Sequence, residues 1–144
     1  MLDLKNWFSP KHYKRLWNVG PPGLIVSLLL IYLTLKYEAA FNLKKYETGH
    51  AWIDVLFFLI LLEMLFILIW TLFSLPPKNR GKKLSTGGIY SFIRHPIYTV
   101  IIFHINLLAS LWVGSYLLLF LVPLQYLLWS KMVIKEEEYL VGIF

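Results

Sequence analysis

Long apolar segments alternate with short polar connectors along the chain. The stretch from Leu16 to Leu35 and the stretch from His95 to Ser130 contain no Asp, Glu, Lys or Arg. A helix needs about 20 predominantly apolar residues to cross the hydrocarbon core, at about 1.5 Å per residue. The second stretch is therefore long enough for two minimal crossings, joined by a tight turn within Trp112 to Tyr116 on the side opposite both termini. The pattern predicts four membrane-spanning helices, over residues 21–37, 52–75, 96–113 and 115–132.

The composition also indicates a membrane protein. Of the 144 residues, 58% are hydrophobic and only 15% are charged, and a soluble domain of this size cannot bury so much apolar surface. The predicted fold class is an all-α integral membrane protein, with a single membrane domain over residues 1–144. Ser9 and Pro10 form a helix-start signal, so residues 1–18 are expected to form an interfacial segment or, as the alternative, a plain juxtamembrane tail. The chain has no cysteine, which excludes disulfides and thiolate metal sites, and we predict no metal site.

The basic residues predict the orientation. The formal net charge is +6, but the Lys and Arg residues lie between the apolar spans, where they meet anionic lipid headgroups rather than nucleic acid. With four spans, eleven basic residues fall on one side of the membrane and three, Lys36, Lys44 and Lys45, on the other. Basic connectors stay in the cytoplasm. We therefore expect a multi-pass protein of the cell membrane, with both termini and the site near them facing the cytoplasm.

Two polar motifs flank the last two predicted spans. The first runs from Leu84 to Tyr98. In it, Gly87-Gly88 lets the backbone approach a ligand, and Pro96 suits the first turn of a helix, whose free N–H groups attract anionic groups. The second is the acidic run Glu136–Glu138, just after the fourth predicted span. If the hairpin folds back, both motifs meet at one membrane face, although each alone also fits a turn, a headgroup anchor or a solvated acidic face.

In this order and spacing the motifs resemble the signature of the isoprenylcysteine carboxyl methyltransferase family, which belongs to a wider group with the phospholipid N-methyltransferases. The elements that carry the resemblance are Leu84-Ser85-Thr86-Gly87-Gly88-Ile89-Tyr90, Arg94-His95-Pro96-Ile97-Tyr98, the uncharged hairpin and Glu136-Glu137-Glu138. The resemblance implies a methyltransferase core over residues 82–144 that holds S-adenosyl-L-methionine between the hairpin and the cytoplasmic connectors. Matched residue by residue, the family's cofactor contacts fall on Lys82, Lys83, Leu84, Ser85, Tyr90, His95, Pro96, Ile97, Tyr98 and Glu137.

Two departures from the family pattern concern the substrate side. Family members usually carry an Arg shortly before the acidic run that helps to hold the substrate, and Val133 stands at about that position here. Lys131 or Lys135 is expected to replace it, although lysine lacks the two-pronged fork that suits a carboxylate. The sequence ends at Phe144, whereas relatives continue with a segment that helps to close the site. The chain is therefore expected to be either a shortened member or an incomplete sequence.

The implied chemistry is methyl transfer to a lipid or lipidated acceptor that arrives through the bilayer. Because the methyl donor is already activated, the protein mainly aligns the reactants and excludes water. Glu137 suits ribose hydroxyls, and Tyr90 and Tyr98 suit the adenine ring or the sulfonium. We expect His95 and Glu137 to be the catalytic residues, because an amine acceptor must lose a proton. The alternatives are a phospholipid N-methyltransferase, a sterol-reductase-like protein that uses NADPH, and a non-catalytic membrane subunit.

Glu63 is the one acidic residue in the apolar run from Val55 to Pro77. An ionisable group at that depth is costly unless it is paired or hydrated, so it should face the bundle or a cavity. The expected partners are His104, Asn106 and Gln125 on the later spans. Glu63 then belongs either to a buried polar knot that sets the helix register or to a pocket for the polar head of the acceptor.

Overall fold

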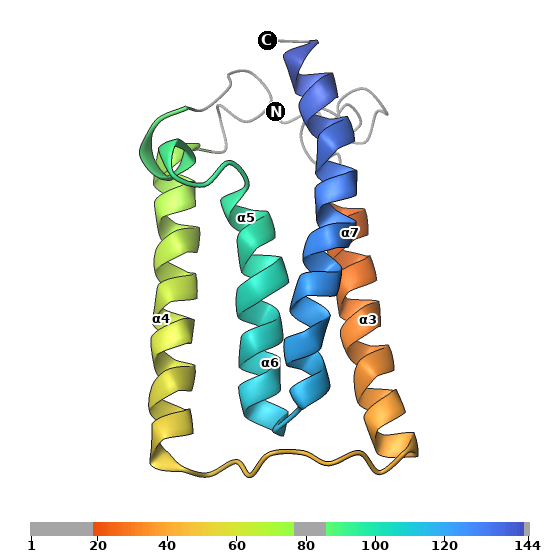
Figure 1. The fold of residues 1–144 in the computed structure, drawn as a ribbon. Coiled ribbons are helices and arrows are strands. Elements are labelled where there is room, and N and C mark those ends of the chain that lie inside the picture. Colours follow the sequence, from red (N-terminus) through yellow and green to blue (C-terminus); the bar gives the residue numbers. More distant parts are fainter. Residues whose placement is uncertain (1–18, 77–85, 143–144) are drawn as a thin grey trace, which may run out of the picture.

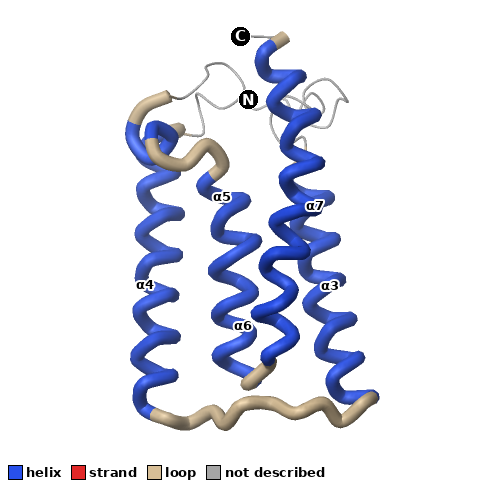
Figure 2. The backbone as a smooth tube through the Cα atoms, viewed as in Figure 1, coloured by secondary structure: helices blue, strands red, loops and turns tan. Residues whose placement is uncertain are grey.

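The computed structural model describes residues 19–76 and 86–142, which form helices and connecting loops without a strand (Figures 1 and 2). Four helical segments of this part are long and apolar enough to cross a membrane, which confirms the predicted number of spans. The predicted interfacial segment 1–18 lies outside the described residues. The helical elements are α3 (Gly20–Ala40), α4 (Ala51–Ser74), η2 (Gly88–Ser91), α5 (Pro96–Thr99), η3 (Val100–His104), α6 (Ile105–Val113) and α7 (Tyr116–Val141).

The ends of the first three spans lie within a few residues of the predicted ones, whereas the fourth span is longer. The helix α7 continues past residue 132, the predicted end of the fourth span, to Val141 and carries the acidic run on its last turns. Lys, Met and Glu are good helix formers, so the helix persists after the apolar stretch ends. The carboxylates of the acidic run therefore have positions set by the helix.

The third span contains a wide turn that the sequence pattern did not predict. Between α5 and α6 the chain forms one π-helical segment, η3, where the regular hydrogen-bond ladder is interrupted. Next to it, the buried Asn106 amide donates to the Ile102 carbonyl oxygen at 2.7 Å and to the Ile101 carbonyl oxygen at 3.4 Å. Backbone carbonyls within a membrane must find hydrogen-bond donors inside the protein. The Asn106 side-chain amide is such a donor.

The four spans lie side by side in the order α4, α5–α6, α7 and α3 (Figure 1). The two helices that follow one another first in the chain, α3 and α4, therefore lie on opposite sides of the hairpin. The long connector between them, residues 41–50, passes beneath the hairpin turn, where the Tyr46 N–H donates to the Gly114 carbonyl oxygen at 2.9 Å. Large apolar side chains cover the outward surfaces, as expected of helices that face lipid.

The hairpin turn lies where the sequence predicts it. Gly114 adopts the left-handed conformation, with φ of 71°, and ends α6. A side chain there would also collide with the Tyr46 carbonyl oxygen, 2.4 Å from the position of a Cβ atom. Both the left-handed backbone conformation and the lack of space for a side chain therefore require glycine at this position. The turn brings the start of α5 and the end of α7 to the same end of the bundle, where α3 also begins (Figure 1).

Candidate functional site

The two polar motifs meet at the end of the bundle where α3 and α5 begin. His95 Nε2 lies 3.2 Å from Glu137 Oε1, although the two residues are 42 positions apart in the chain. The Arg94 guanidinium approaches the same carboxylate oxygen at 3.5 Å. The His95 side chain is 24% exposed and that of Glu137 is 38% exposed, so both remain accessible. The predicted meeting of the two motifs is confirmed, and Glu137 is its centre.

A second contact across the hairpin joins Tyr98 to Glu136. The Tyr98 hydroxyl donates to Glu136 Oε2 at 2.8 Å. The rings of Tyr98 and His95 stack almost parallel, with centroids 5.1 Å apart. The two contacts therefore support each other, since Tyr98 holds the His95 ring in place while Glu137 binds its nitrogen. We had not predicted this role for Glu136, because nothing in the acidic run distinguishes one carboxylate from the next.

Trp129 supports the site from the interior of the bundle. It is 1% exposed, its ring lies 4.6 Å from that of Tyr98, and its Nε1 donates to Ser27 Oγ of α3 at 2.9 Å. A Cβ atom at Gly23 would come within 2.4 Å of the Trp129 ring. Glycine thus lets α3 approach α7 closely enough for the indole to lie between them. The Tyr98 ring was predicted to contact the cofactor, and part of its surface is covered because it contacts His95 and Trp129.

The Gly-Gly pair has two different roles. Gly88 adopts a positive φ of 63° and lies against Ser74, whose Oγ would be 2.2 Å from a Cβ atom at that position. Ser74 Oγ accepts a hydrogen bond from the Ile89 N–H at 3.1 Å. Gly88 therefore docks the connector on the end of α4. Around Gly87 no atom of residues 19–76 and 86–142 lies within 4 Å of a Cβ position, so of the two glycines Gly87 is the one with an open backbone surface toward the described residues.

The other predicted site residues differ in position. Pro96 is buried in the first turn of α5, as expected, and Ile97 beside it is 39% exposed. Tyr90 packs against the cluster of Ile67, Ile89 and Val100, on the α4 side of α5.

On α7, Lys131 is exposed, Val133 packs against the cluster around Trp129, and only the backbone of Lys135 is described. The predicted cofactor contacts Lys82, Lys83, Leu84 and Ser85 lie outside the described residues.

Glu63 has one of its three expected partners. Its Oε2 lies 3.8 Å from His104 Nε2, and its side chain is 66% exposed on the outer surface. Asn106 and Gln125 are both fully buried and bind each other instead, with Asn106 Nδ2 donating to Gln125 Oε1 at 3.0 Å. The expectation that they pair with Glu63 is wrong. A buried polar knot does exist, but it consists of Asn106, Gln125 and the Ser27 carbonyl oxygen of α3.

The polar groups at this end of the bundle suit an organic cofactor with hydroxyl groups. Glu137 uses Oε1 for both His95 and Arg94, and its Oε2 makes no hydrogen bond within the described part of the chain. A free carboxylate oxygen beside an aromatic ring fits the ribose of a nucleoside. No group of three or more His, Asp or Glu side chains is arranged to hold a metal ion among the residues that the structure describes.

The comparison with known proteins identifies a family for the part of the chain that contains this site. Residues 55–142, more than half of the chain, match the model of the isoprenylcysteine carboxyl methyltransferase (ICMT) family. The match extends from α4 to the end of α7 and includes every contact at His95, Tyr98 and Glu137. No curated protein and no solved structure matches the chain.

Proposed function

The chain belongs to the isoprenylcysteine carboxyl methyltransferase family, and on this basis we propose that it transfers a methyl group from S-adenosyl-L-methionine to a lipid or lipidated acceptor. The family membership, together with four helices able to cross a membrane, supports a membrane methyltransferase over the sterol-reductase-like alternative. The observation that carries the proposal is the contact of His95 with Glu137 across the hairpin. It joins the two motifs of the family signature at one end of the apolar bundle.

The proposed cofactor site lies around this contact. The free Oε2 of Glu137 accepts from ribose hydroxyls, the backbone of Gly87 offers open space, and the partly exposed face of His95 packs against the cofactor. Residues 82–144 form the proposed cofactor-binding core of a single membrane domain. The remaining proposed contacts are Lys82, Lys83, Leu84, Ser85, Tyr90, Pro96, Ile97 and Tyr98.

Bound S-adenosylmethionine supplies a methyl group already activated on a sulfonium. The chain's own residues then need only orient the acceptor in line with the methyl group and exclude water. A carboxylate acceptor attacks through its oxygen and needs no base. An amine acceptor must release a proton. Because His95 Nε2–H donates to the Glu137 carboxylate, the proposed proton acceptor is the other ring nitrogen of His95, Nδ1.

The acceptor is proposed to enter from the bilayer, because the site lies at the end of lipid-facing spans. Lys131 is exposed on α7 one helical turn or more before the acidic run, where it can contact an acidic acceptor, and Lys135 is proposed for the same role. Glu63 is proposed to contact a polar group of the acceptor deeper in the membrane. The arrangement proposed for the cell has this site on the cytoplasmic side of the cell membrane.

Binding of radiolabelled S-adenosylmethionine to the purified protein tests the proposal. We expect saturable binding that His95→Ala and Glu137→Gln each weaken about tenfold or more, as loss of a charge-assisted hydrogen bond of roughly 1.5–3 kcal/mol requires. Glu47→Gln changes an exposed carboxylate at the far end of the bundle and should leave affinity unchanged. Unchanged affinity in both site variants would refute the site, and absence of binding to the intact chain would favour a non-catalytic subunit.

A further inference from the structure

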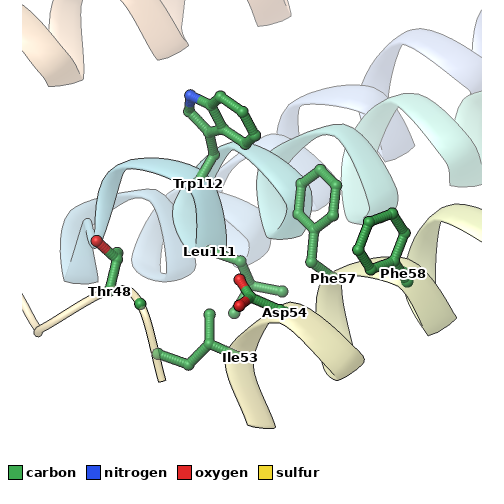
Figure 3. A pocket seen from close by; sticks show the side chains of 8 residues that line it. Thr48, Ile53, Asp54, Phe57, Phe58, Leu111 and Trp112 are labelled. Atoms are coloured by element: carbon green, nitrogen blue, oxygen red, sulfur yellow. The ribbon is translucent and has the colours of Figure 1, made fainter. Parts of the chain in front are cut away.

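A hollow lies between α4 and α6 at the hairpin end of the bundle (Figure 3). This end is opposite to the one where α5 begins, next to His95 (Figure 1). Its volume is about 280 Å³. It is lined by Thr48, Gly49, Ile53, Asp54, Phe57, Phe58, Leu111 and Trp112. The side chains that give it chemical character are three aromatic rings and one carboxylate.

The aromatic rings form an angled wall. The rings of Phe57 and Trp112 lie 5.8 Å apart at 45°, and those of Phe57 and Phe58 lie 5.8 Å apart at 89°. Trp112 is 75% exposed and Phe58 is 61% exposed, so the chain itself leaves much of this wall uncovered. Differently tilted rings present several π faces and edges to one small group, which is the arrangement that binds ammonium ions.

The charge in the hollow is negative. Asp54 lies in the first turn of α4, and Figure 3 shows its carboxylate between α4 and α6, beside Leu111. No other residue of the described ranges 19–76 and 86–142 forms an ion pair or hydrogen bond with this carboxylate. A carboxylate beside aromatic faces favours a cation and repels an anion. Of the three lysines at this end, Lys44 and Lys45 line a separate hollow with His50.

The hollow also lies at the depth of lipid headgroups. Asp54 is in the first turn of α4 and Trp112 is in the last turn of α6, so both are at the ends of apolar spans. Aromatic residues are common in this layer of the membrane, which explains Trp112 alone. It does not explain why an unpaired carboxylate lines the same hollow as the aromatic rings.

We propose that this hollow binds the ammonium headgroup of a zwitterionic phospholipid from the leaflet at the hairpin end. The Asp54 carboxylate pairs with the ammonium, and Trp112, Phe57 and Phe58 surround its alkyl groups. The lipid's acyl chains then lie along the exposed apolar surface of α4. This site is independent of the methyltransferase site, since the two are at opposite ends of the bundle.

Native mass spectrometry of the detergent-purified full chain with added lipids tests the proposal. We expect the protein to retain phosphatidylcholine and phosphatidylethanolamine at least fivefold better than phosphatidylglycerol, which carries no ammonium. Asp54→Asn and Trp112→Leu should each lower the retained phosphatidylcholine about fivefold. The matched control, Glu47→Gln, removes a carboxylate of the neighbouring connector outside the hollow and should change nothing.

Asp54→Glu keeps the charge and should retain most of the binding, which separates loss of charge from loss of fold. Equal retention of phosphatidylglycerol, or unchanged retention in Asp54→Asn, would overturn the proposal. Full displacement of phosphatidylcholine by equimolar tetramethylammonium would also overturn it, by assigning the hollow to a free cation. Persistence of the lipid against that competitor supports it.

Discussion

Two polar residues inside the apolar spans differ in burial and in hydrogen bonding. Asn106 is fully buried and joined to both Gln125 and the backbone of its own helix, whereas Glu63 is 66% exposed beside His104. Counted along the helices at about 1.5 Å per residue, both lie more than 10 Å from the end that carries His95. The first is built into the packing of three helices, and the second faces outward. The two residues should therefore respond differently to substitution.

Asn106→Ala should destabilise the protein. The change removes the side-chain donor to the Ile102 carbonyl oxygen and to Gln125 Oε1 in a dry interior, at a cost of about 1–2 kcal/mol within a membrane bundle. A thermal unfolding experiment in detergent should show a lower midpoint. An unchanged midpoint would mean that this polar knot does not contribute to stability.

Glu63→Gln should leave the fold and cofactor affinity nearly unchanged. The side chain is largely exposed, and its one contact, to His104 at 3.8 Å, is long. If Glu63 contacts the acceptor as proposed, the rate of methyl transfer should fall severalfold while S-adenosylmethionine binding persists. Normal transfer with normal binding would exclude Glu63 from the acceptor site.

At the scale of elements, the long uncharged apolar stretches predicted the spans well and their internal detail poorly. Proline and uncharged length placed the start of α5 and the turn at Gly114, because both depend on local chemistry. The π-helical segment and the length of α7 were missed, because each depends on what packs beside the helix or on helix formers beyond the membrane. The meeting of His95 with Glu137 followed from the hairpin alone.

The close approach of α3 to α7 gives a prediction for two glycines one turn apart. Gly23→Ala should destabilise the protein by about 1–3 kcal/mol, because overpacking forces Trp129 out of place. Gly20→Ala is the matched control, since the nearest atom of Tyr98 lies 3.6 Å from the added Cβ atom. Thermal midpoints measured by tryptophan fluorescence should fall for Gly23→Ala only. Equal midpoints would show that the indole can move aside at little cost.

For the whole molecule, the order of the spans was not predictable from the sequence. The sequence did not predict that α3 packs beside α7 and not beside α4, because the outward faces of all spans are similarly apolar. The contacts that join α3 to α7 and to the hairpin turn include polar ones, such as Trp129 with Ser27 and the buried Glu38 with Ser115. The Glu38 contact joins α3 to the hairpin turn at the end opposite to the proposed cofactor site.

The last prediction concerns which membrane side each end of the bundle faces. The four-span topology predicted from the sequence assigns eleven of the fourteen Lys and Arg residues to the side of the His95 end and three to the side of the hairpin end. The excess of basic charge should hold the His95 end in the cytoplasm.

The chain has no cysteine, so single cysteines can be introduced without background labelling. Glu47→Cys at the hairpin end should react with an impermeant thiol reagent on intact cells, and Gly87→Cys, where a side chain has open space, should react only after permeabilisation. Labelling of Gly87→Cys on intact cells, with Glu47→Cys protected, would reverse the orientation and place the proposed methyltransferase site on the outer face. Labelling of both on intact cells would contradict the four-span arrangement itself.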